Sequence, residues 1–442
     1  MTDCNRQPVR FSTLSRQKIV GDFDGGRLTT DGGGLLLREG DRQLDLIRRL
    51  ADCIPDPRNP LLTVHDQRVL LAQRIFGIAL GYEDLNDHDT LREDPLFSVL
   101  ADKRPDPDEP LASSPTLCRF ENRVDRKSLV RMSEVLVETF IASHRKPPKE
   151  LILDFDATDD LVHGQQENRF FQGYYDAYCF LPLYVFCGDR LLVAYLRPSN
   201  IDPAMHTRAI LKLLVRRLRE AWPKVKIILR GDSGFCRWRL MRWCDRHDVS
   251  YVLGLARNRV LERRAKPFMQ AAEAAFARTG RKLRRFHEVR YAARSWDRRR
   301  RVIVKAERLR QGPNVRFVVT NLLKPTPRHI YDGLYTARAD MENRIKEQQL
   351  GLFADRTSCR KFLANQFRLL LASAAYVLIE HIRRTALKGT ELAKAQVTTL
   401  RLKLFKIAGR VITSVRRVVF HFSSSYPYQQ LFRQTVERLV PD

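Results

Sequence analysis

The stretch Leu151-Ile-Leu-Asp-Phe-Asp156 is the part of the sequence from which the fold is most directly predicted. Its apolar run favours a β-strand. Because alternate residues of a strand face the same side of a sheet, Asp154 and Asp156 share one face. Thr158 follows two positions later, where the strand gives way to a loop. The stretch therefore predicts a strand that presents carboxylates near its end.

The segments after this strand predict an α/β domain over residues 146–257. The expected strands are 174–180, 183–196, 225–229 and 251–255, and the expected helices are 204–221 and 237–247. The order is three strands, helix, strand, helix, strand, and the first three strands can form a meander. The strand at 225–229 ends in Arg230-Gly-Asp-Ser-Gly-Phe235, so Asp232 lies just past a strand end. Ligands of open α/β sheets gather at the carboxyl ends of strands.

The charge of the whole chain predicts a polyanionic partner. Its 442 residues include 79 Lys and Arg against 51 Asp and Glu, a formal net charge of +28. DNA is the commonest partner of large basic proteins, through sequence-independent phosphate contacts. A hydrophobic content of 44% is enough for folded cores, and the length suggests two to four domains. The eight cysteines are scattered without a CxxC pair, which argues against a zinc ribbon or a disulfide framework.

Hydropathy along the chain predicts a soluble, cytoplasmic protein without a membrane partner. The longest clean apolar stretch, 369–379, is shorter than the ~20 residues that span a bilayer. The N-terminal residues lack the apolar segment of a secretory signal.

Composition divides the rest of the chain into further regions. Residues 1–145 are predicted to be mostly helical, and their position before the α/β domain suggests recognition of DNA ends. Between Arg257 and Arg310 there are 19 Lys and Arg against 5 Asp and Glu, and strand-like runs at 286–291, 301–305 and 316–320 predict a basic, β-rich insertion over 258–330. A helix completing the core is expected over 331–375, and a basic helical region over 376–442.

Arginines of the insertion are candidates for DNA contact. Arg298, Arg299, Arg300 and Arg301 form an unbroken run beside a predicted strand. Such a run suits either a phosphate-contacting strand edge or a merely solvated charged loop.

A third acidic residue, Glu342, lies in a predicted helix that starts at Tyr335. At about 100° per residue, Tyr335, Arg338, Glu342 and Lys346 share one helical face. Hard cations such as Mg²⁺ take carboxylate oxygens, and two such ions can hold both the attacking and the leaving oxygen of a phosphodiester. Asp156, Asp232 and Glu342 are therefore candidate metal ligands. Taken singly, each acid also suits a plainer role in a turn or in a solvated salt bridge.

Several motifs together resemble the DDE-type transposases of bacterial insertion sequences, and specifically insertion-sequence family thirteen-eighty. The matching segments are Leu28-Thr-Thr-Asp-Gly-Gly-Gly-Leu35, Gly81-Tyr-Glu-Asp-Leu-Asn-Asp-His-Asp-Thr-Leu-Arg92, Leu153-Asp-Phe-Asp-Ala-Thr158, His163-Gly-Gln-Gln166, Arg230-Gly-Asp-Ser-Gly-Phe235 and the Tyr335–Glu342 helix. The resemblance implies an α/β fold with an RNase H-like catalytic core, a β-rich insertion, a mostly helical N-terminal domain and a helical C-terminal region.

The same resemblance implies the activity and its residues. The first acid, in Asp-x-Thr, corresponds to Asp156, the second to Asp232, and the Glu of the Tyr-x2-Arg-x3-Glu signature to Glu342. These would hold two Mg²⁺ ions, with Mn²⁺ as a substitute, for cleavage at the element's ends and strand transfer into target DNA. The partners implied are the terminal inverted repeats and target DNA, bound by a dimer on the nucleoid. Tyr335 and Arg338 would contact DNA.

One position departs from the signature. The family's final lysine falls at position 349, which is Gln349 here, and Lys346 on nearly the same face is the candidate replacement. Asp154 stays a rival or partner of Asp156. The competing interpretations are a catalytically inactive DNA-binding protein derived from a transposase, and an RNase H-like nuclease without strand transfer.

Overall fold

The computed structural model describes residues 8–440, so the outermost residues of the predicted N- and C-terminal regions lie outside it. The chain forms two compact units. One comprises the chain up to Glu121 together with the chain from Leu378 onward, and the other is Asn122–Val377. This division differs from the five consecutive regions expected from the sequence. The first and last regions share one unit, and helix α7 (Arg126–Ala142), expected in the N-terminal region, belongs to the other.

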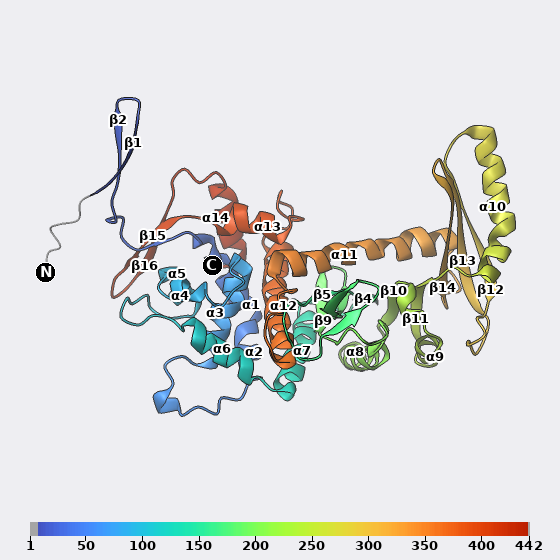
Figure 1. Cartoon of the computed structure of the whole chain (residues 1–442), viewed down its shortest axis with the longest axis horizontal. Helices are drawn as coiled ribbons and strands as arrows, with labels where there is room; N and C mark the ends of the chain where they lie inside the picture. Colours follow the sequence, from blue (N-terminus) through green and yellow to red (C-terminus); the bar gives the residue numbers. More distant parts are fainter. Residues whose placement is uncertain (1–7, 441–442) are drawn as a thin grey trace. The chain divides into compact units, whose positions relative to one another are not determined.

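The unit Asn122–Val377 is built on a mixed eight-stranded sheet (Figure 1). Strands β10 (Lys226–Gly231) and β11 (Val249–Leu255) run parallel to β4 (Glu150–Ala157). Strands β8 (Leu183–Cys187) and β9 (Arg190–Tyr195), and the strands beyond β11, pair antiparallel. This confirms the α/β class. Across the sheet the strands are β12 (Leu283–Tyr291), β13 (Arg300–Leu309), β14 (Gly312–Thr320), β11 (Val249–Leu255), β10 (Lys226–Gly231), β4 (Glu150–Ala157), β8 (Leu183–Cys187) and β9 (Arg190–Tyr195).

The predicted meander exists and begins with the predicted strand at 151–156, but its second and third strands both come from the stretch 183–196. The stretch 183–196, expected as one strand, is the hairpin β8–β9, which turns at Gly188 with a φ of 61°. Only glycine adopts such a backbone at no steric cost. The strand expected at 174–180 is instead β7 (Ala177–Phe180), which pairs with β5 (Asp160–Leu161) and β6 (Phe170–Gln172) in a separate small sheet.

The two faces of the large sheet carry different side chains because residues alternate along each strand. Leu151, Leu153 and Phe155 of β4 are buried in one core with residues of α7, α8 (Thr207–Ala221) and α9 (Trp238–Arg246). Burial of each such side chain contributes about 1.5–3 kcal/mol. A smaller core contains Ile228 of β10, Val252 of β11 and residues of the segment 329–335. Asp154 and Asp156 alternate along β4 with Leu153 and Phe155, so they face the other side of the sheet.

The predicted insertion continues the sheet rather than forming one of its own. The strand-like runs expected within 258–330 correspond to β12, β13 and β14, and β14 pairs with core strand β11. The long helix α10 (Arg259–Thr279) packs along these strands and was not expected (Figure 1).

The other unit combines helices with a three-stranded sheet, in which β15 (Gly409–Thr413) pairs with both β3 (Leu28–Thr29) and β16 (Val418–Phe422). This pairing joins the two ends of the chain, and it corrects the expectation that the C-terminal region is only helical. A hairpin of β1 (Val9–Leu14) and β2 (Gln17–Gly21) precedes it. The helices are α1 (Leu35–Leu44), α2 (Leu46–Ala51), α3 (Gln67–Leu80), α4 (His88–Leu91), α5 (Pro95–Leu100), α6 (Ser114–Arg123, at the boundary), α13 (Val397–Leu400) and α14 (Gln429–Leu439).

The glycine run that follows Asp31 has a packing role in this unit. A Cβ on Gly33 would lie 1.9 Å from the carbonyl oxygen of Leu404, so only glycine fits there. The buried Asp31 carboxylate pairs with Lys406 Nζ at 2.6 Å and accepts a hydrogen bond from Tyr82 at 2.7 Å. The motif therefore fixes a turn against the C-terminal segment.

Helix α12 (Phe362–Thr385) is long and apolar enough to cross a membrane by length and composition. No such stretch was expected from the sequence, because charged and polar residues interrupt the apolar residues on either side of 369–379. In the structure 89% of the most apolar part of this helix is buried, as in the core helix of a folded protein.

Candidate active site

Two of the predicted acids lie at the same edge of the sheet. Asp156 is the penultimate residue of β4, and Asp232 comes directly after β10. Because these strands are parallel neighbours, their carboxyl ends meet at one edge. Asp232 also caps the short helix η3 (Ser233–Phe235), since its Oδ1 accepts a hydrogen bond from the Gly234 amide at 2.8 Å.

The third acid lies on a helical segment whose winding is irregular. The region expected as one regular α-helix comprises a π-helical part η4 (His329–Tyr335), a 3₁₀ turn η5 (Thr336–Arg338), helix α11 (Ala339–Lys346) and a second π-helical part η6 (Glu347–Gly351). The expected rotation of 100° per residue therefore does not hold throughout. Such changes of winding often occur at functional sites.

Arg338 connects the first and third acids. Its Nη1 lies 2.7 Å from Asp156 Oδ2, and its Nη2 lies 2.6 Å from Glu342 Oε1. Burial would lower the pKa of Arg338, but Asp156, Glu342 and Asp232 together raise it. Burial raises the pKa of Asp156 to about 6; Arg338 opposes this, while Asp232 and Glu342 add to it. All three predicted acids thus act on one guanidinium.

The three acids do not form a ready-made metal cage. Within residues 8–440, no group of three or more His, Cys, Asp or Glu side chains lies close enough to hold a metal ion. Arg338 occupies the space between the Asp156 and Glu342 carboxylates, and Asp232 binds its own loop. The chemistry of the donors fits a hard divalent cation, because all three are carboxylates and two of them already pair with a positive charge.

Tyr335 approaches the Asp232 loop because Gly254 makes room for it. A Cβ on Gly254 of β11 would lie 2.6 Å from Tyr335 Oη and 2.8 Å from the Ser233 amide nitrogen. Burial raises the pKa of Tyr335, and Asp232 and Asp156 add to this while Arg338 opposes it. The sequence analysis named Tyr335 but not Gly254, whose only sequence signal is a glycine inside a strand.

Asp154 and Asp156 pair with different arginines. Asp154 forms a bidentate ion pair with Arg230 on β10, and its side chain is 3% exposed. The Asp154 carboxylate is therefore buried and held by Arg230. Sequence reasoning missed Arg230, although the residue lies two positions before Asp232 just as Asp154 lies two before Asp156.

Gln349, which stands where the signature in the sequence resemblance has a lysine, has a packing role here. The Gln349 side chain donates to the Asp159 carbonyl and to Asp160 Oδ1, both at 2.9 Å. Asp160 is fully buried, and burial raises its pKa to about 8. Lys346 is exposed on α11 and stays the candidate replacement.

The four arginines of the predicted DNA-contacting run separate into two pairs. Arg300 bridges Asp245 and Asp297, and Arg301 binds Glu288 and backbone carbonyls near 322–325; both side chains are buried. These internal partners argue against phosphate contact by Arg300 and Arg301. Arg298 and Arg299 are exposed, although Arg298 pairs with Asp245 at 2.6 Å.

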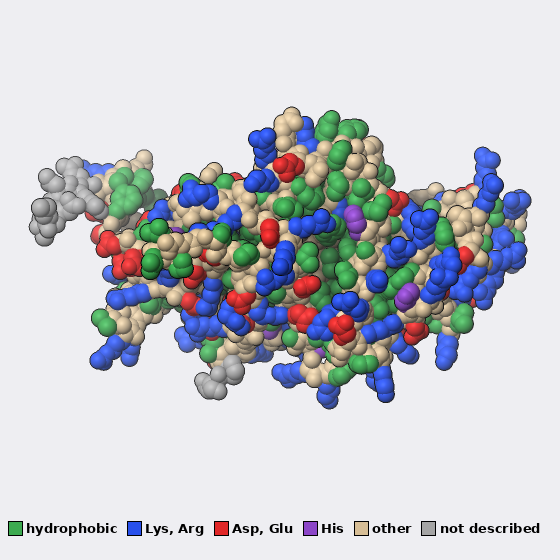
Figure 2. Space-filling model, turned by 90° about the horizontal axis from the view of Figure 1, so that it is seen from below, with side chains coloured by type: hydrophobic (Ala, Val, Ile, Leu, Met, Phe, Trp, Pro, Cys, Tyr) green, Lys and Arg blue, Asp and Glu red, His purple; other side chains and the backbone are tan. Residues whose placement is uncertain are grey.

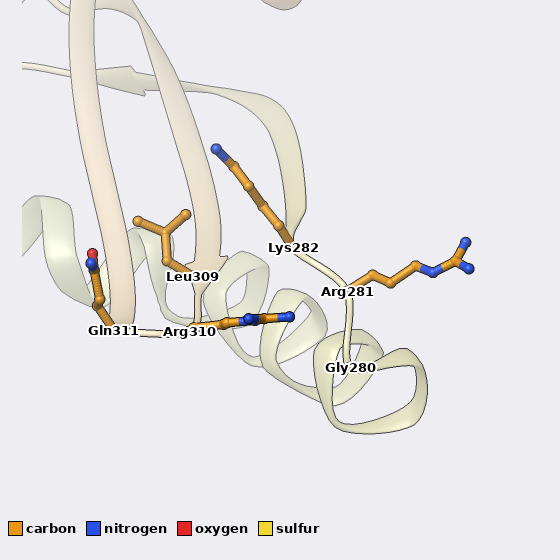
Figure 3. A pocket seen from close by; sticks show the side chains of 6 residues that line it. All are labelled: Gly280, Arg281, Lys282, Leu309, Arg310 and Gln311. Carbon is orange, nitrogen blue, oxygen red and sulfur yellow. The ribbon is translucent and has the colours of Figure 1, made fainter.

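Exposed cations also gather at the far tip of the inserted strands. A shallow pocket there is lined by Arg281, Lys282 and Arg310 from two neighbouring turns; the Arg281 side chain points away from the pocket, and the Arg310 side chain points toward the turn at 280–281 (Figure 3). Lys282 also pairs with Glu307 at 3.2 Å. Lys and Arg side chains crowd this end of the sheet in the space-filling view (Figure 2).

Comparisons with known proteins place the chain in a family. Among solved structures, a cryo-EM structure of a piggyBac transposase synaptic complex with hairpin DNA is similar at a TM-score of 0.39 and 11% identity, over 94% of this chain and 86% of that chain. No curated protein matches the chain. The family model described as transposase DDE domain group 1 matches residues 11–441. The chain therefore belongs to the DDE-domain transposases of group 1.

Proposed function

We propose that this protein is an active transposase of the type found in insertion-sequence family thirteen-eighty. It would cut DNA at the ends of its element and join the freed 3′ ends to target DNA. Membership of the DDE-domain transposases supports the class of reaction. The observation that carries the site assignment is Arg338, whose guanidinium lies between Asp156 and Glu342 and is influenced by Asp232 as well.

The catalytic unit would be RNase H-like. The strand order β9-β8-β4-β10-β11 supports this, because β8 and β9 form an antiparallel meander with β4 while β10 and β11 run parallel to it. In this arrangement Asp156 and Asp232 lie at adjacent parallel strand ends, and the segment 329–351 carries Glu342, which shares Arg338 with Asp156.

The protein's own residues would do the following work. Asp156, Asp232 and Glu342 would hold two Mg²⁺ ions, which supply Lewis-acid stabilisation of the attacking and leaving oxygens. Arg338 would exchange its carboxylate partners for a DNA phosphate, which suits its planar donor fork. Tyr335 would contact the DNA beside it.

The DNA itself would follow the positive surface of the protein. Lys346, Arg298 and Arg299 are exposed and suit backbone contacts, as do the cations at the strand tip. The unit that contains both ends of the chain would recognise the terminal inverted repeats. Two copies would pair the two ends of the element on the bacterial nucleoid.

The test uses the purified full-length chain and a duplex that carries the inverted repeats flanking its gene. We expect Mg²⁺-dependent cutting at the repeat boundary and joining of pre-cut ends to a target plasmid. Asp232→Asn should abolish cutting but keep DNA binding in a gel-shift assay, because the overall charge hardly changes. Cutting retained by Asp232→Asn would refute the site assignment.

The same assay separates the competing functions. Binding of the repeats by the wild-type chain without cutting would identify an inactive DNA-binding derivative. Cutting without joining of pre-cut ends would identify a nuclease.

A further inference from the structure

One buried arginine, Arg230, links the two strands that precede Asp156 and Asp232 to the helical segment that leads to Glu342. Arg230 lies on β10, two residues before Asp232, and pairs in register with Asp154 on β4, two residues before Asp156. Its Nη2 lies 2.6 Å from Asp154 Oδ2, and its Nε binds the other carboxylate oxygen. Its Nη1 donates to the Leu334 carbonyl at 2.5 Å. Leu334 belongs to η4, the segment that leads into Arg338 and Glu342.

Arg230 contacts the helical segment next to the place where its winding changes. Leu334 is one residue from the place where π-helical winding changes to a 3₁₀ turn. Four residues later Arg338 binds Asp156 and Glu342. A shift of this carbonyl along the sheet would therefore move Arg338 and Glu342 relative to Asp156.

The chemistry of the contact requires an arginine. The side chains of Arg230 and Asp154 are 8% and 3% exposed. Each buried charge is therefore stabilised by the other, and removal of one would leave the other unpaired in the interior. A guanidinium presents parallel donors to a carboxylate and a further donor to a carbonyl on its other side. The ammonium of a lysine is a compact point charge and would satisfy only one of these partners well.

We propose that Arg230 is a positioning residue that sets where the segment 329–346 lies over the ends of β4 and β10. It touches neither DNA nor metal, and acts through the Leu334 carbonyl and through Asp154. The proposal rests on the proposed function in that the groups positioned are the acids Asp156, Asp232 and Glu342.

The first test measures the position of the helical segment without catalysis. Hydrogen exchange of the full-length chain, followed by mass spectrometry, should show faster exchange across 329–346 in Arg230→Lys than in wild type. Titration with Mn²⁺ alone should show about 10- to 100-fold weaker binding, the usual effect of losing a residue that orients ligands.

A paired variant separates positioning from stability. Arg230→Met combined with Asp154→Leu removes both charges, so no unpaired charge is left in the interior. We expect this variant to melt near the wild-type temperature yet to keep the weak Mn²⁺ binding and the faster exchange, because the Leu334 contact is absent. Wild-type Mn²⁺ binding and wild-type exchange in the double variant would overturn the proposal.

A matched control is available in the other unit. Arg74 and Glu121 form an ion pair at 2.8 Å with both side chains 0% exposed. The double variant Arg74→Met with Glu121→Leu should leave exchange over 329–346 and Mn²⁺ binding unchanged; a change equal to that of the Arg230 variant would also overturn the proposal. If the wild-type chain neither cut nor joined DNA while Arg230→Lys still loosened 329–346, the proposed function would fail, but the link between Arg230 and the segment 329–346 would stand.

Discussion

Arg338 and Arg300 each bridge two carboxylates, but only one of them lies in an open environment. Arg300 joins Asp245 and Asp297 beneath the inserted strands, with a side chain that is 2% exposed. Arg338, whose side chain is 17% exposed, joins Asp156 to a Glu342 side chain that is 49% exposed. A guanidinium that is buried away from water is part of the core. A guanidinium beside an exposed carboxylate can be replaced there by another cation, such as a metal ion. Burial therefore separates a structural ion cluster from a candidate catalytic one.

The largest expected effect comes from changing one carboxylate of each cluster. Asp156→Asn should reduce DNA cutting to the level of a reaction without protein, since an amide is a poor ligand for Mg²⁺, while the melting temperature changes little. Asp245→Asn should lower the melting temperature and keep cutting measurable. A nicking assay and a thermal melt on both variants check this, and cutting by Asp156→Asn would break the comparison.

Removal of the sealed arginine should have the largest effect on stability. Arg300→Met leaves Asp245 and Asp297 without their shared cation, and we expect a loss of about 3 kcal/mol in the free energy of unfolding. Denaturant unfolding measures this loss. Arg299→Met, which removes an exposed neighbour, should change the free energy by less than about 0.5 kcal/mol. Equal effects of the two variants would contradict the structural role of Arg300.

A smaller effect is expected where Gly254 makes room for Tyr335. Gly254→Ala should cost about 1–3 kcal/mol, because its Cβ would overlap Tyr335 Oη and the backbone at Ser233. Adding Tyr335→Phe removes one of these overlaps and should recover part of the loss in a thermal melt. No recovery in the double variant would mean that the backbone contact dominates.

The finest test concerns competition between Arg338 and a metal. In Arg338→Met the acids lose their internal cation, so the chain without DNA should bind Mn²⁺ roughly tenfold more tightly, about 1.4 kcal/mol. Calorimetric titration measures this. Arg344→Met is the control, because Arg344 lies on the same helix but pairs with Asp189 and Glu347. Unchanged or weaker Mn²⁺ binding in Arg338→Met would show that Arg338 does not compete.

Much of the sheet was predictable because its strands carry long apolar runs. The strands at 151–156, 225–229 and 251–255 correspond to β4, β10 and β11. The hairpin β8–β9 was missed because its only signal is Gly188-Asp189 inside one apolar stretch. Helix α10 was missed because strongly basic composition and Pro267 obscure its alanine-rich helical pattern.

The site was predictable only in part, for a physical reason. Sequence position and family signature point to Asp156, Asp232 and Glu342, but they do not say what the side chains bind. The pairing of Arg230 with Asp154 depends on strand register, and the burial of Arg300 and Arg301 depends on long-range packing. Neither is encoded locally, which is why the run of four arginines looked uniform in the sequence.

The edge-to-edge pairing of β14 with β11 has a mechanical consequence. Gly254 and Val318 are register partners, so the backbone beside Tyr335 is bonded directly to the inserted strands. The inserted strands and the strand beside the Asp232 loop are therefore joined by one continuous ladder of backbone hydrogen bonds. Adding a single residue to β14 would slip the register and turn every following side chain to the opposite face. The register of this strand therefore decides which of its side chains face the core that contains Val252 and Ile330.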